Sequence, residues 1–128
     1  MTSLKSKMFN FLMRNRHLFR GKFKKDTFDF NTSITEFREQ CEKGANKYAI
    51  IPNGISIREQ IIEGMQSEWL IPNESDPAKV ILYVHGGGYV SGSCNDHRAI
   101  VSKFAKNTGV TNLIYEYRLA PENPFPAA

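Results

Sequence analysis

The stretch VILYVHGGGYVSGS, residues 80–93, decides the fold. Apolar residues 80–84 lead into His85 and then into Gly86, Gly87 and Gly88. An apolar run of this kind predicts a strand buried on both faces of a largely parallel sheet. Three adjacent glycines cost backbone entropy and bury no side chain. We therefore expect the fold to need the bare backbone, and its N–H groups, at this point.

The residues after the glycines predict a helix and then another strand. Apolar side chains keep helical spacing from Asp96 to Asn107, with Asp96 as the expected N-cap and Gly109 as the stop. The segment TNLIYEY, residues 111–117, then has the pattern of a strand. Strand, helix and strand in this order indicate a right-handed crossover and an α/β class of fold.

Upstream, the pattern predicts one helix and a pair of strands. Ser33 and Glu36 have capping-box spacing, and the helix that they open should end around residues 44–47. After a Pro-Asn-Gly turn signal, the segments ISIREQIIEG and QSEWLIP each favour a strand. We expect a tight turn at Gly64 and Met65 to join them.

Charge is distributed unevenly along the 128 residues. Residues 1–25 carry eight basic side chains and no acidic one, whereas residues 26–128 carry nine basic and thirteen acidic ones, so the net charge of +4 belongs to the first segment. No zinc, RNP or helix-turn-helix signature accompanies it, so we expect no nucleic-acid partner.

The apolar spacing in the same segment predicts a basic amphipathic helix ending near Gly21. Packing on the rest of the protein is the favoured interpretation; contact of residues 3–20 with a membrane surface and a mitochondrial presequence are the alternatives.

Composition suggests a cytoplasmic protein of one domain. With 41% apolar residues the chain is ordinary for a globular protein, and it has no apolar run or secretory signal of the kind that targets a membrane. Cys41 and Cys94 are too few and too far apart for a disulfide framework or a zinc site, so we expect two reduced thiols. No metal or organic cofactor is implied.

Three uses of a glycine-rich backbone compete in the loop. A dinucleotide site needs G-x-G-x-x-G, but Ser91 stands where the third glycine should be, and no Gly-Lys-Ser/Thr of a P-loop is present. The third use is an oxyanion hole, in which prearranged N–H donors stabilise the negative charge that develops on an acyl oxygen. His-Gly-Gly-Gly after a core strand is the form that this loop takes in lipases and esterases.

Two motifs together carry a family resemblance. HGGGYVSGSCNDHR and, about 30 residues later, YEYRLAPENPFPAA resemble the hormone-sensitive-lipase-like branch of the α/β-hydrolases. GMQSEWLIP is similar to the bacterial acetyl-ester and monoterpene ε-lactone hydrolases of that branch, and the match spans residues 55–128. The resemblance implies the N-terminal portion of an α/β-hydrolase fold, a mostly parallel sheet with flanking helices. Residues 1–48 would be a helical cap segment and residues 49–128 a core that is incomplete at its C-terminus.

The same resemblance implies roles for the loop residues. The N–H groups of Gly86 and Gly87 would be the oxyanion donors, and Gly88 would give the loop room to turn. His85 would anchor the loop through its side chain and would not act as a general base. Tyr89 would border the acyl pocket, with a plain core aromatic as the alternative.

A second motif, Tyr117 to Glu122, resembles the buttress loop of the family. Arg118 and Glu122 would fix the backbone beneath the active site. The family's usual Asp before the tyrosine is replaced here by Glu116. Surface or capping roles are expected for the nearby polar residues Cys94, Asp96 and His97.

The catalytic triad of such enzymes is not in place in this sequence. The closest string to G-x-S-x-G, residues 54–58, lacks the last glycine and precedes the glycine loop, and no histidine follows His97. We therefore expect the front part of a longer hydrolase of esters or lactones that is inactive by itself. The resemblance also implies that the apolar edge of strand 80–84 would be bare, as a site for aggregation or for pairing with a complementary C-terminal half. The alternative is a non-catalytic remnant or a module that binds a ligand or a partner.

Overall fold

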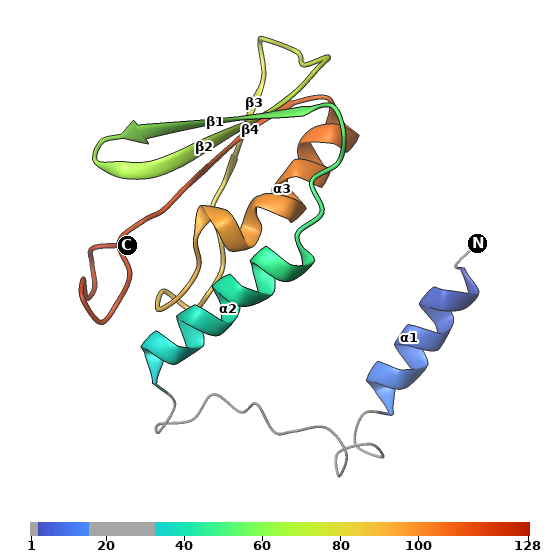
Figure 1. Ribbon diagram of the computed structural model, residues 1–128, viewed down its shortest axis with the longest axis horizontal. Helices are drawn as coiled ribbons and strands as arrows, with labels where there is room; N and C mark the ends of the chain where they lie inside the picture. The colour runs from blue at the N-terminus through green and yellow to red at the C-terminus, as the bar shows by residue number, and fades with distance from the viewer. Residues whose placement is uncertain (1–2, 16–32) are drawn as a thin grey trace. The chain divides into compact units, whose positions relative to one another are not determined.

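The computed structural model describes residues 3–15 and 33–128. The chain divides into two compact units, residues 1–31 and residues 32–128. Helices and strands follow one another in the order α1 (Leu4–Arg14), α2 (Ile34–Tyr48), β1 (Ile55–Ile62), β2 (Met65–Pro72), β3 (Val80–Tyr83), α3 (Cys94–Thr108) and β4 (Thr111–Tyr115) (Figure 1). Of these, α1 belongs to the first unit and all others to the second.

Helix α1 begins with a side-chain cap. The Ser3 hydroxyl accepts a hydrogen bond from the N–H of Ser6 at 3.2 Å, which satisfies one of the free donors of the first turn. The helix ends at Arg14 with Asn15 as its C-cap. Its expected end near Gly21 lies outside the described residues. Within the parts of the chain that the structure describes, no helix is long and apolar enough to cross a membrane.

Strands β1 and β2 form an antiparallel hairpin with Ile62 paired to Met65. Glu63 and Gly64 make the turn, with φ of 49° and 78°. Two left-handed residues are the mark of the type I′ turn, whose twist matches that of the flanking strands. The hairpin is confirmed, but the prediction that Met65 belongs to the turn is wrong, because a two-residue turn is complete at Gly64.

The sheet has the strand order β1-β2-β4-β3. Strand β4 pairs antiparallel with β2 and parallel with β3. Helix α3 connects β3 to β4 and packs against β2 and β4, and α2 in turn contacts α3 (Figure 1). The expected strand, helix, strand unit is therefore present inside a mixed sheet.

Helix α3 begins three residues earlier than the sequence pattern suggested. Its N-cap is Ser93, whose hydroxyl accepts from the N–H of Asp96 at 3.1 Å, while the Asp96 carboxylate accepts from the N–H of Ser93 at 3.1 Å. This reciprocal pair is a capping box, so Asp96 is the third helical residue and the prediction that it is the N-cap is wrong. Gly109, with φ of 66°, ends the helix as predicted.

The core lies between α3 and one face of the sheet. Val101 and Ala105, one helical turn apart, are fully buried against Leu70 of β2 and Ile114 of β4, and Cys94 completes the cluster. Burying a leucine or isoleucine side chain contributes about 1.5–3 kcal/mol each. This layer fixes α3, and with it the loop that enters α3, relative to the sheet.

Strand β3 is an edge strand of four residues. Val80, Leu82 and Val84 are 54%, 59% and 57% exposed, so the expectation of a strand buried on both faces is wrong. The reason is that, within residues 33–128, α3 covers one face only, while no other element of this unit packs on the opposite face. That uncovered face holds an apolar cavity of about 170 Å³ lined by Ile62, Met65, Ser67, Leu82, Leu113 and Tyr115.

Candidate functional site

The glycine loop connects the end of β3 to the N-cap of α3. Its chain turns tightly because the carbonyl of Gly87 accepts from the N–H groups of Val90 at 3.2 Å and Ser91 at 3.1 Å. Gly87 and Gly88 have φ of 131° and 62°. A Cβ atom on Gly87 would lie 2.0 Å from the Ser91 carbonyl oxygen, so this position accepts only glycine.

The three glycines present backbone donors without acceptors. In the described part of the chain, no atom accepts a hydrogen bond from the N–H of Gly86, Gly87 or Gly88. A Cβ atom on Gly86 or on Gly88 would meet nothing within 4 Å, so open space adjoins both residues. Free peptide N–H groups beside open space are suited to bind an anion or a developing negative charge.

His85 is buried at the base of this loop, with 2% of its surface exposed. Its Nδ1 lies 2.9 Å from the Gly86 carbonyl, which assigns the proton to Nδ1 as the donor. The ring stacks on Tyr117 at 4.2 Å, and the Tyr117 hydroxyl donates to the His85 carbonyl at 2.8 Å. Its Nε2 is buried and has no hydrogen-bond partner among the described residues. These contacts hold His85 in place from both its ring and its backbone.

Tyr89 follows the glycines in a left-handed conformation, with φ of 63°. Its side chain is 66% exposed, which excludes the alternative of a plain core aromatic. The ring approaches Tyr117 edge-on at 6.3 Å, and the carbonyl accepts from the N–H of Ala120 at 2.8 Å. Its place beside an acyl pocket stays a prediction.

The structure does not bring Arg118 and Glu122 together. Arg118 is exposed and donates to the Ala127 carbonyl at 3.3 Å. Glu122 instead forms a two-point ion pair with Arg38 of α2, at 2.8 and 2.9 Å. The hydrogen bonds from this guanidinium lower the pKa of Glu122 to about 2.

Arg38 is a residue of the site that sequence reasoning missed. Besides Glu122, it donates from Nε to the Val90 carbonyl at 2.7 Å and from Nη2 to the Ala120 carbonyl at 2.8 Å. It therefore reaches both the glycine loop and the segment after β4. These partners lie 52 and 82 residues away along the chain, and no local pattern marks such a contact.

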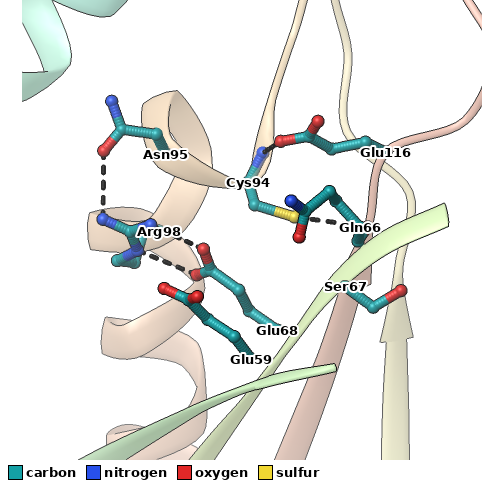
Figure 2. Close-up of a pocket in the computed structure, with 8 residues that line it drawn as sticks. All are labelled: Glu59, Gln66, Ser67, Glu68, Cys94, Asn95, Arg98 and Glu116. Carbon is teal, nitrogen blue, oxygen red and sulfur yellow. Dashed lines mark hydrogen bonds and ion pairs between the residues drawn. The ribbon is translucent and has the colours of Figure 1, made fainter. Parts of the chain in front are cut away.

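A polar cavity of about 210 Å³ opens at the start of α3 (Figure 2). It is lined by Glu59, Gln66, Ser67, Glu68, Cys94, Asn95, Arg98 and Glu116. Glu68 is 5% exposed and is paired with Arg98, which also donates to Asn95 at 3.0 Å. Glu116 accepts from the N–H of Cys94 at 3.0 Å, so the acid that departs from the family pattern binds the first turn of α3.

This cavity has no activated nucleophile. Burial, reinforced by the nearby carboxylates of Glu68 and Glu116, raises the pKa of the Cys94 thiol to about 12, so the thiol stays protonated. Cys41 and Cys94 are both free, as predicted. Among residues 3–15 and 33–128, no three His, Cys, Asp or Glu side chains are arranged to hold a metal ion. The cavity lining contains no residue of the glycine loop.

Comparison with known proteins identifies relatives of this chain. Residues 81–128 match a family with the α/β hydrolase fold. An acetyl-hydrolase of Streptomyces hygroscopicus is 42% identical over 62 residues, which are 48% of this chain and 20% of the relative. An ethyl acetate hydrolase of Pseudomonas putida is 43% identical over 60 residues, which are 44% of this chain and 19% of the relative.

Solved structures extend the likeness over nearly the whole chain. An esterase/lipase from an uncultured bacterium superimposes with a TM-score of 0.74 at 32% identity, covering 91% of this chain and 38% of that protein. A hormone-sensitive lipase from a metagenome library gives a TM-score of 0.74 at 31% identity, covering 93% and 37%. The chain thus spans about a fifth of the length of these curated relatives and just over a third of these solved structures. It has the α/β hydrolase fold, and it is similar to the N-terminal part of hormone-sensitive-lipase-like esterases.

Proposed function

We propose that this chain supplies the oxyanion-hole loop of a carboxylic ester or lactone hydrolase. The observation that carries the proposal is the run of three glycine N–H groups that have no acceptor among the described residues, with open space beside Gly86 and Gly88. Relatives named acetyl-hydrolase and ethyl acetate hydrolase support a small ester as the substrate.

The chemistry follows from where charge develops during acyl transfer. When a nucleophile attacks the ester carbonyl, the oxygen becomes an anion, and fixed N–H donors stabilise it more than they stabilise the neutral substrate. The N–H groups of Gly86 and Gly87 are the proposed donors, and Gly88 lets the chain turn beside them. One such donor is typically worth about 2.7–4 kcal/mol of barrier, which is on the order of 100- to 1000-fold in rate.

The remaining catalytic groups would come from other polypeptide of the full-length protein. A serine nucleophile, an acid and a histidine base would form the acyl-enzyme and release it. We propose that residues 1–48 contribute a cap, that a complementary C-terminal half covers the free edge of β3, and that the 128-residue chain alone is inactive. The two free thiols fit a cytoplasmic location.

Hydrolysis of p-nitrophenyl acetate tests the proposal in two steps. The purified 128-residue chain should show no more than the buffer rate. Full-length protein encoded by the extended reading frame should be active, and Gly86→Val, which puts a branched side chain in front of the donors, should lower kcat/KM at least 100-fold, as estimated for a lost donor. Gly44→Ala in α2, where a Cβ also meets nothing within 4 Å, is the matched control and should keep full activity.

Two results would contradict the proposal. Full activity of the Gly86→Val enzyme would contradict the role of Gly86 as an oxyanion donor. Hydrolysis by the isolated chain above the buffer rate would contradict the proposal that the 128-residue chain is inactive by itself. A ligand- or partner-binding module is the second candidate, favoured by the lack of a G-x-S-x-G string in this sequence. A reading frame that continues without a serine elbow would support that candidate over the enzyme.

A further inference from the structure

One side chain of α2 reaches the backbone of two separate loops. Arg38 donates from Nε to the Val90 carbonyl at 2.7 Å and from Nη2 to the Ala120 carbonyl at 2.8 Å. Its two Nη atoms also hold the Glu122 carboxylate at 2.8 and 2.9 Å. Four of the five N–H donors of the guanidinium are thereby used. All of these contacts lie within the unit formed by residues 32–128.

These bonds close a ring with the glycine loop. The N–H of Ala120 donates to the Tyr89 carbonyl at 2.8 Å, while Arg38 binds the carbonyls of Ala120 and of Val90, the residue after Tyr89. The backbone is therefore held at two successive carbonyls: the Tyr89 carbonyl is bound by Ala120, and the Val90 carbonyl is bound by Arg38. Tyr89 has a left-handed φ of 63°. A residue with a side chain keeps this conformation only when its surroundings impose it, so these hydrogen bonds are needed here.

The ring lies next to the turn that leaves the glycine donors free. Val90 both donates its N–H to the Gly87 carbonyl at 3.2 Å and offers its own carbonyl to Arg38. Without the bond from Arg38 to the Val90 carbonyl, the turn could relax, and the backbone of Gly86, Gly87 and Gly88 could change its conformation.

We propose that Arg38 is a positioning residue of the glycine loop. It acts through the Val90 and Ala120 carbonyls, and Glu122 orients its guanidinium. As an oxyanion device the assignment rests on the proposed function, but the contact itself does not. Lysine cannot replace Arg38, because an ammonium on a flexible stem lacks the planar fork that meets a carboxylate and two carbonyls together.

Glycine-selective ¹⁵N NMR of the 128-residue chain tests the proposal without a substrate. The chain has nine glycines, and several of them belong to segments that Arg38 does not bind. Arg38→Gln should shift the amide resonances of Gly86, Gly87 and Gly88 by more than a linewidth. Arg38→Lys should not restore them. The resonances of Gly54 before β1, Gly64 in the hairpin turn and Gly109 at the C-cap of α3 should stay in place.

A matched control comes from the same helix. Lys43 pairs with Glu39 at 3.4 Å on the exposed surface of α2, so Lys43→Gln changes one charge without touching the loop and should leave Gly86, Gly87 and Gly88 unchanged. A merely stabilising role for Arg38 would lower the unfolding midpoint and leave the loop shifts of the folded state unaltered.

The outcomes separate this proposal from the hydrolase function. Unchanged loop resonances in Arg38→Gln overturn the positioning role, whatever the activity of the full-length protein. If Arg38→Gln does not fold, Glu122→Gln decides: this exposed change should produce smaller shifts in the same three glycines, and no shift there also overturns the role. Loop shifts together with an inactive full-length protein would keep the positioning role and reject the oxyanion function.

Discussion

Alanine at each of the three adjacent glycines should give three different stabilities. Gly86 has a φ outside the left-handed region, and a Cβ there meets nothing within 4 Å. Gly88 has the same free space but a left-handed φ of 62°. Gly87 has a φ of 131°, and a Cβ there would lie 2.0 Å from a backbone oxygen of Ser91. The series thus separates backbone conformation from steric contact within one motif.

The magnitudes follow from these geometries. Gly86→Ala should stabilise the chain by about 0.4–1 kcal/mol, because alanine restricts the unfolded state and fits the folded one. Gly88→Ala should cost about 1–2 kcal/mol for the left-handed conformation alone. Gly87→Ala should cost most, since conformational strain of about 1–3 kcal/mol adds to an overpacking cost of about 1–3 kcal/mol.

Urea unfolding followed by circular dichroism and by the fluorescence of Trp69, the single tryptophan, measures the series. The expected order of stability is Gly86→Ala above the parent chain, then Gly88→Ala, then Gly87→Ala. Gly44→Ala, inside α2, is a control that should add about 1 kcal/mol through helix propensity. Equal losses at Gly86 and Gly87, or a larger loss at Gly88 than at Gly87, would refute the loop geometry and the reasoning built on it.

Three other expectations concern charged and thiol groups. Arg98→Met should destabilise the chain by about 3–5 kcal/mol in urea unfolding, because it leaves the buried Glu68 carboxylate unpaired, and adding Glu68→Met should recover most of the loss. The folded pKa of Glu122, about 2, lies below its ordinary 4.5. The stability difference between the parent chain and Glu122→Gln should therefore be complete above pH 4.5 and be lost progressively as the pH falls toward and through about 2; a difference at pH 2 as large as that at pH 6 would contradict the Arg38 pairing. Iodoacetamide at pH 8, read by mass spectrometry, should label Cys41 in the folded chain but reach Cys94 only in urea, and labelling of folded Cys94 would contradict its burial and its raised pKa.

Local signals predicted most of the fold. The stop at Gly109, the hairpin and the strand, helix, strand unit each depend on residues close together in the sequence, and each is present. The start of α3 was misplaced because Ser93 and Asp96 are both good capping residues three positions apart, and only the reciprocal bonds decide which one is the N-cap.

Long-range features were not accessible in the same way. An apolar pattern shows what a strand is suited to pack against, whereas the exposure of Val80 and Leu82 depends on which elements cover the sheet. Arg38 lies on α2 among other charged residues, and only the folded chain reveals that its partners are Val90 and Ala120. The glycine motif indicated where the site is, but not what holds it.

The uncovered face of the sheet has a thermodynamic consequence. Heat capacity and denaturant sensitivity both scale with the surface that becomes hydrated on unfolding, and the side chains of Val80, Leu82 and Val84 are already more than half hydrated in the folded chain. A typical domain of 128 residues would give a ΔCp of roughly 1.5–1.9 kcal/mol/K. This chain should fall below that range, and its urea transition should be correspondingly broad.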